Sequence, residues 1–269
     1  LRSPFQNRQI LSDRFDPVAL NILKLYPLPT RAGIVNNFDA VASQPDDDRQ
    51  GTVRLDHNFS DKYRAFARFS LSDNDNFEPN YWGTIASPGG FNQFITGKNF
   101  VWDNVVTFSP ALLAIFRYGF AWQTNYRDPF SLGVDLEALG FPRSFVSQVQ
   151  ERFLPAQSVT GFNGPDETGN QKWSRYTHSL AAAFTWIRPK HTIKFGWDGR
   201  LYRDHNFAVG SPSGNFSYGT TFTSGPDPRA GVPAGAPPYL AFASFLLGLP
   251  TSGTHQFTDA TSMQLYYSA

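Results

Sequence analysis

Residues 191–203, HTIKFGWDGRLYR, alternate between large apolar side chains and charged ones. Ile193, Phe195 and Trp197 occupy one parity, whereas charged residues such as Lys194 occupy the other. A period of two is typical of a β-strand, because successive side chains point to opposite faces of a sheet. The stretch therefore predicts a strand with one aromatic face and one charged face, and these faces need different surroundings.

The same alternation begins earlier in the chain, in two segments joined by a short turn. We expect Phe59 to face Tyr63 across that turn. Val53 then faces Phe69, and the apolar residues of both segments fall on one face of the pair. The segments therefore predict an antiparallel hairpin with the same two-faced character.

Two further pairs of segments follow the same rule, and in the last of them Trp186 is expected to face Ile193. Pro189 suits the turn of that pair, because proline presets the φ angle of the first central turn position. The sequence therefore predicts three hairpins, over residues 50–72, 98–123 and 173–202.

Short and long connections alternate strictly along the chain. The turns within hairpins are a few residues long, whereas long links cover residues 73–97, 124–172 and 203–261. Most links in compact soluble domains have about 4 to 6 residues. In outer-membrane barrels, short periplasmic turns alternate with long extracellular loops, and strands of about 10 residues place apolar side chains on lipid and polar ones in a wet lumen.

This pattern predicts an all-β fold, an antiparallel up-and-down transmembrane β-barrel segment of about seven strands with long extracellular loops. A soluble β-sandwich is the alternative, since its core would also produce clean alternation. Aromatic residues near the expected strand ends favour the barrel, because Trp and Tyr form girdles at the membrane interface. These residues are Trp122, Tyr126, Trp173, Trp186 and Tyr202.

Composition supports a chain with much ring surface and few charges. Aromatic residues make up 16% and charged residues 17%, against roughly 25% charged residues in soluble domains. The longest apolar run, residues 239–249, is shorter than the ~18 residues that a spanning helix needs. A formal net charge of +1 gives no basic surface for nucleic acid, and the absence of cysteine excludes disulfides and thiolate metal sites.

The chain divides at about residue 50. Residues 1–49 are expected to form an extracellular segment with a short helix, which Asp16 caps and Pro17 begins. Residues 50–269 are expected to form the partial barrel, with a second short helix near residues 239–248. The first residues lack a signal-peptide pattern and the last ones alternate without a turn, so we expect an internal piece of a longer protein.

No residues show the spacing of a catalytic or metal site. The five histidines are scattered singly, and the acidic runs at residues 46–48 and 73–78 do not fit an EF-hand loop. No phosphate-binding glycine loop, GxSxG elbow or HExxH motif is present. We therefore expect no enzyme activity, no cofactor, and no catalytic, cofactor-binding or metal-binding residues.

Rings and one cation in the long links are the candidate ligand contacts. They stand among glycine and proline residues, a composition typical of adaptable binding loops. The alternative is that each is simply part of a solvated loop. The candidates are Tyr81, Trp82, Phe91, Arg143 and Tyr218.

Four segments together resemble the large TonB-dependent outer-membrane receptors that carry an N-terminal carboxypeptidase-regulatory-like domain. They are SDRFDPVALNILKLYPLPT (12–30), RLDHNFSDKYRAFARFS (54–70), TWIRPKHTIKFGWDGR (185–200) and FASFLLGLP (242–250). Each is similar to a barrel hairpin or loop of that family, and none is a ligand signature. The plug, the TonB-contacting box and the signal peptide of such receptors are not among these residues.

The resemblance implies import of a scarce, bulky nutrient across the outer membrane of a Gram-negative bacterium, such as an oligosaccharide or a siderophore. The implied partners are outer-membrane lipid, the plug domain of the same parent chain, the TonB, ExbB and ExbD complex, and the nutrient ligand. Two alternatives come from other classes. One is a non-transporting surface or adhesion barrel, and the other is a soluble β-rich carbohydrate-binding module.

Overall fold

The computed structural model describes residues 3–33, 36–165, 171–207, 210–227, 231 and 234–269, so parts of the two longest predicted links lie outside the described residues. One antiparallel sheet of seven strands dominates the fold, in the order β1-β2-β3-β4-β6-β7-β10. Its strands are β1 (Asp46–Ser60), β2 (Tyr63–Phe77), β3 (Phe91–Ser109), β4 (Leu112–Pro129), β6 (Gln171–Arg188), β7 (His191–Phe207) and β10 (Asp259–Ser268). The predicted all-β, antiparallel architecture with about seven strands is confirmed.

The predicted hairpin registers are confirmed at the positions that carry the alternation. Val53 pairs with Phe69, and Trp186 pairs with Ile193. The prediction for the first turn was wrong by one position, because Ser60 rather than Phe59 pairs with Tyr63. A register irregularity precedes Ser60, yet the rings of Phe59 and Tyr63 still stack at 4.7 Å.

The strands are longer than the alternation alone predicts. The hairpins cover residues 46–77, 91–129 and 171–207, beyond the expected 50–72 and its two counterparts. The residues added to β2, Asp73 to Asn76, are polar on both faces, so they lack an apolar period but still form the backbone ladder. Backbone pairing therefore continues where an apolar face is no longer required.

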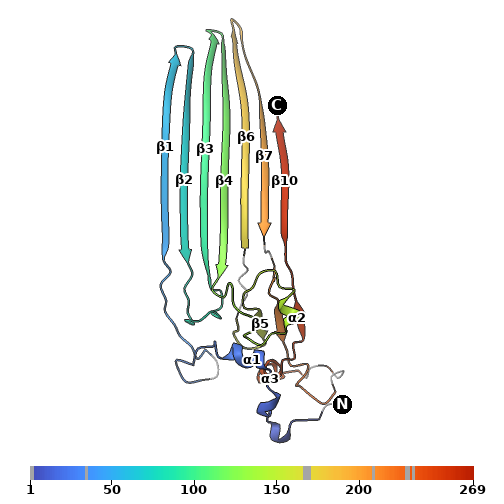
Figure 1. The fold of residues 1–269 in the computed structure, drawn as a ribbon. Coiled ribbons are helices and arrows are strands. Elements are labelled where there is room, and N and C mark those ends of the chain that lie inside the picture. Colours follow the sequence, from blue (N-terminus) through green and yellow to red (C-terminus); the bar gives the residue numbers. More distant parts are fainter. Residues whose placement is uncertain (1–2, 34–35, 166–170, 208–209, 228–230, 232–233) are drawn as a thin grey trace.

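All the long links gather at one end of the sheet, opposite the short turns (Figure 1). We call the described residues of 3–45, 78–90, 130–165 and 210–258 the cap. Its helices are η1 (Gln6–Arg8), η2 (Ser12–Arg14), α1 (Pro17–Leu23), α2 (Arg143–Val146) and α3 (Tyr239–Leu246). A small second sheet joins β5 (Ala156–Val159), β8 (Asn215–Tyr218) and β9 (Ser252–Thr254).

Asp16 begins α1 as the sequence predicts. Its carboxylate accepts a hydrogen bond from the Ala19 backbone N–H at 2.9 Å, and Pro17 occupies the first helical turn. Gly248 follows α3 with a φ of 64°, a conformation that favours glycine. A Cβ on Gly248 would lie 2.7 Å from the Asp16 carboxylate, so glycine also permits the close approach of α3 to α1. Neither helix, nor any other in the described ranges, is long and apolar enough to cross a membrane.

Candidate functional site

The large sheet has one apolar and one polar face over most of its length. Residues that are register partners on neighbouring strands share a face, so a row of partners can be followed across the sheet. One such row on the apolar face is Phe69, Phe100, Phe120, His178, Leu201 and Leu265. Such rows place the aromatic residues of different hairpins on one continuous surface.

A row of polar residues first interrupts the apolar face at the same level on every strand from β2 to β10. The first fully polar row is Asp73, Thr96, Thr124, Ser174, His205 and Thr261. In the row before it, the Lys98 ammonium lies 4.6 Å from the centre of the Trp122 ring, which stacks on Tyr176. Amphipathic rings beside long cationic side chains are typical of a membrane interface.

The apolar run has the thickness of a lipid layer. On β4 it extends from Leu112 to Trp122 through alternate residues. At about 3.4 Å per residue and a tilt of about 40°, this run spans about 26 Å, close to the ~25 Å apolar band of outer-membrane barrels. The dimensions of the apolar face therefore match a membrane-spanning wall.

Polar side chains on the apolar face hydrogen-bond to one another. The Tyr118 hydroxyl lies 2.9 Å from Nδ1 of His178, its neighbour on β6. The Tyr63 hydroxyl donates to Oδ1 of Asn104 at 2.9 Å. Since an unpaired polar group in an apolar environment costs about 2 kcal/mol or more, these pairs reduce the cost of placing them on this face.

The opposite face carries ion pairs. The Arg117 guanidinium lies 2.6 Å from the carboxylate of Asp103, whose side chain is 6% exposed. Arg200 lies 3.1 Å from Asp198 on its own strand, β7. Full charges at the level of the aromatic rings are compatible with a water-filled interior and incompatible with lipid.

The cap has a hydrophobic core of its own, to which every long link contributes. Ile22 comes from the first segment, Ala86 from the second, Leu136 from the third and Phe245 from the last, and each is at most 2% exposed. Residues so distant in sequence bury their side chains together, so the links form one folded body.

Hydrogen bonds between the links also stabilise the cap. The Asn21 side-chain amide donates to the Leu139 carbonyl at 3.2 Å. The Phe153 backbone N–H donates to the Ser213 hydroxyl at 3.0 Å, and Ser213 donates to the Glu151 carbonyl. These bonds satisfy buried backbone groups that irregular loops would otherwise leave unpaired.

Tyr81 and Arg143 are the exposed members of the predicted ligand contacts. The Tyr81 side chain is 47% exposed, and Arg143 is the exposed first residue of α2. Phe91, the first residue of β3, is half-buried, and its ring lies 5.0 Å from the Arg127 guanidinium. All three stay predictions as ligand contacts.

Trp82 and Tyr218 differ from the exposed rings that the sequence suggests. The Trp82 ring lies 4.8 Å from the Tyr26 ring and packs against the core. Tyr218 is 7% exposed, and burial, with a smaller contribution from the Asp16 carboxylate, raises its pKa to about 12. As ligand contacts both stay predictions, but their packing gives them a structural role in the cap.

The five candidates do not form a single cluster. Apart from the sequence neighbours Tyr81 and Trp82, no ring contact or hydrogen bond joins two of them in the described part of the chain. Within the same residues, no three potential metal ligands of the His, Cys, Asp or Glu type come together. The most distinctive features of the structure are therefore a sheet with one apolar and one polar face and a cap with a hydrophobic core of its own.

Comparison with known proteins agrees with this geometry. A family model described as an outer membrane beta barrel domain matches residues 1–269, so the match covers both the sheet and the cap. No curated protein and no solved structure matches the chain at a significant level.

Proposed function

This chain belongs to the outer membrane beta barrel domain family, and we propose that it forms part of the wall and the outer surface of a TonB-dependent transporter. Family membership places it in the outer membrane of a Gram-negative bacterium, in contact with lipid. The proposed cargo is a scarce, bulky nutrient, such as an oligosaccharide or a siderophore. Its import would use a plug domain of the same parent chain and the TonB, ExbB and ExbD complex.

The hydrophobic core of the cap is the observation that supports capture of a solute. Closing a hairpin needs only a few residues, yet the links between these hairpins build helices, a second sheet and a buried core. The long-link end of an outer-membrane barrel faces the cell exterior. The cap is thus the part that would meet a nutrient first, and we propose a binding role for it without catalysis.

A non-transporting surface barrel is the second candidate, because adhesion would also use an elaborate outer surface. It needs no plug movement and no energy from the inner membrane. A soluble carbohydrate-binding module fits poorly with membership of an outer-membrane family. The two remaining candidates therefore differ in energy dependence.

Energy-dependent uptake tests the proposal. We expect a strain without the gene to lose uptake of at least one solute from a mixture of oligosaccharides and chelated iron, measured as depletion of the medium by mass spectrometry. A protonophore should abolish the same uptake in the parent strain, and the reintroduced gene should restore it. Unchanged depletion in the deletion strain, together with lost attachment to surfaces, would favour the adhesion barrel instead.

The assignment of the apolar face to lipid leads to a prediction on β4. Phe116 lies near the middle of the run from Leu112 to Trp122, so Phe116→Arg places a cation near the bilayer midplane. We expect the substitution to lower the free energy of unfolding in lipid by about 2 to 4 kcal/mol. The measurement uses the parent protein, that is, the longer chain of which residues 1–269 are expected to be a piece. Reversible denaturant titration in liposomes measures this change.

Ile115→Arg is the matched control. Ile115 is next to Phe116 on β4 but lies on the opposite face of the sheet, where its register partners are Val105 and Ala183. We expect it to cost much less, since the guanidinium reaches water. Phe116→Ala separately measures the loss of the contact with Phe184, whose ring centre is 5.7 Å away. Equal costs for the two arginine variants would show that the faces are wrongly assigned.

A further inference from the structure

The polar face of the sheet carries more cations than it can pair internally. Arg54, Arg117 and Arg200 each form an ion pair with an aspartate. Three other cations on that face are exposed and have no acidic partner within 4 Å in the described part of the chain. These cations are Arg64, Arg68 and Lys194.

Arg68 is the clearest case, because it directly faces Arg54 across the β1–β2 pair. Like charges at directly opposed positions destabilise a sheet. Asp56 binds the Arg54 guanidinium through two hydrogen bonds, of 2.8 and 2.7 Å, and so compensates that charge. No described acidic side chain does the same for Arg68, so its charge has no partner among the described residues.

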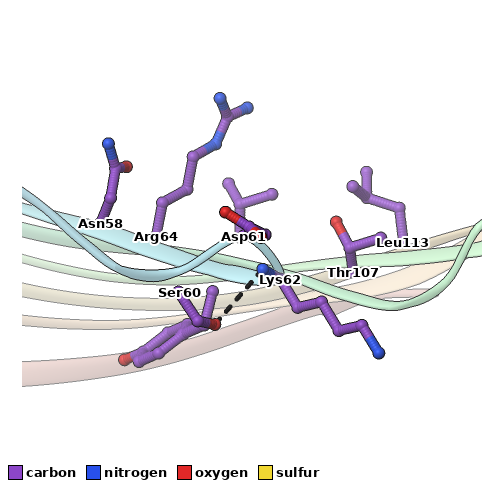
Figure 2. A pocket seen from close by; sticks show the side chains of 9 residues that line it. Asn58, Ser60, Asp61, Lys62, Arg64, Thr107 and Leu113 are labelled. Atoms are coloured by element: carbon purple, nitrogen blue, oxygen red, sulfur yellow. Dashed lines mark hydrogen bonds between the residues drawn. The ribbon is translucent and has the colours of Figure 1, made fainter.

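Arg64 lies nearer the short turn, beside a hollow of about 520 Å³. Figure 2 shows its side chain on the same side of the sheet as Asn58, Thr107 and Leu113, whereas Lys62 points the other way. Asp61 also lines the hollow, but it forms no ion pair with Arg64 or Lys62. Arg64 is thus a free guanidinium beside the amide of Asn58 and the hydroxyl of Thr107, two groups that can also donate to an anion.

The row of the sheet that leads from Arg64 to β7, the strand of Lys194, carries no charge. The row of register partners that starts at Arg64 continues through Val105, Ile115 and Ala183 to Gly196. Lys194 is the next residue of β7 on the same face. Arg64 and Arg68 are about 13 Å apart along β2. On β3, Asp103 lies between their two rows, but it pairs with Arg117.

We propose that this wall binds and guides an anionic solute, one that carries carboxylate, sulfate or phosphate groups. The inference rests on the proposed transport function and adds the charge class of the cargo. Unpaired arginine and lysine side chains line anion-selective pores, because they replace part of the hydration shell of an anion and raise its local concentration. An arginine also binds carboxylate or phosphate through two parallel hydrogen bonds.

The local potential can be measured with charged thiol reagents, since residues 1–269 contain no cysteine. Val105→Cys, in the parent protein freed of any other cysteine, places a thiol opposite Arg64. The probes are sulfonatoethyl and trimethylammonioethyl methanethiosulfonate, and each rate is divided by the rate with a small free thiol. We expect the anionic reagent to be favoured by about tenfold or more. Arg64→Gln with Arg68→Gln should remove most of that preference.

Ala182→Cys is the control on the apolar face, where both reagents should react very slowly. Reaction at residue 182 with silence at residue 105 would invert the faces and overturn the proposed function itself. Equal normalised rates at residue 105, or a preference unchanged by the arginine substitutions, would overturn only the inference. Silence at both positions would also overturn it, because the wall would then be covered by protein, as by an acidic segment of a plug, and would not be a solute path.

Discussion

Residues 1–269 expressed alone should fail to insert into liposomes as a stable barrel. The sheet ends at β1 on one side and β10 on the other, and these two strands do not pair with each other. The free edge of a strand presents unpaired N–H and C=O groups, each of which costs several kcal/mol in lipid. This is the largest effect that we expect, because the penalty repeats along both edges.

Self-closure would not remove the penalty, because the number of strands is odd. β1 and β10 both run from the cap toward the short turns, as Figure 1 shows. Joining them would need a parallel pair, whereas bacterial barrels of a single chain are antiparallel with an even number of strands. Two copies in the same orientation would meet the same obstacle. Each edge needs a strand that runs the opposite way.

Protease protection and heat-modifiable migration in gels measure insertion. The full-length parent protein, refolded in the same liposomes, serves as the positive control. A protected, heat-modifiable species made only from residues 1–269 would contradict the prediction, whatever its oligomeric state. Loss of protection in both samples would point to the refolding conditions, which are therefore set with the parent protein first.

The sequence predicts the hairpins well because one physical constraint acts at every second residue. A one-residue slip between Val53 and Phe69 would move every ring to the opposite face, so the apolar pattern specifies the register. The constraint weakens where the strands leave the apolar layer, as at Asp73. There the backbone ladder continues without any side-chain period, which explains why the predicted hairpins are too short.

The cap was beyond the reach of such patterns. Its core joins Ile22, Leu136, Tyr218 and Phe245, which belong to separate links and are surrounded in sequence by glycine, proline and polar residues. Local signals find its helices, since Asp16 and Gly248 mark a beginning and an end. They do not show which segments pack together, and so they treat buried Tyr218 as an exposed ring.

The unpaired cations on the polar face of the sheet could be predicted only in part from the sequence. The alternation places Lys194 on the polar face, but the lack of partners for Arg64 and Arg68 depends on which strands are neighbours. The predicted pairing of Val53 with Phe69 already places Arg68 opposite Arg54, whereas the neighbours of this hairpin on β3 come from the structure. Sequence patterns thus predict the faces, and the strand neighbours decide the balance of charge on them.

Phe245→Ala should destabilise the cap by about 3 to 5 kcal/mol, the usual cost of removing a buried ring. Phe245 is 1% exposed, and its ring lies edge-on to Tyr218 at 5.2 Å, so the truncation leaves a cavity between α3 and β8. None of the described residues of this core belongs to the seven-stranded sheet. We therefore expect faster hydrogen exchange and proteolysis in the cap of the parent protein, with unchanged heat-modifiable migration of the barrel.

Tyr239→Ala is the matched control, because Tyr239 begins the same helix but is 64% exposed. This substitution should change the free energy of unfolding of the cap by no more than about 0.5 kcal/mol. If the cap captures solute as a preformed surface, Phe245→Ala should also reduce uptake, whereas Tyr239→Ala should leave the exchange rates of the core untouched. Equal exchange in both variants would mean that the buried core does not hold the links together, and the cap would then be a set of independent loops.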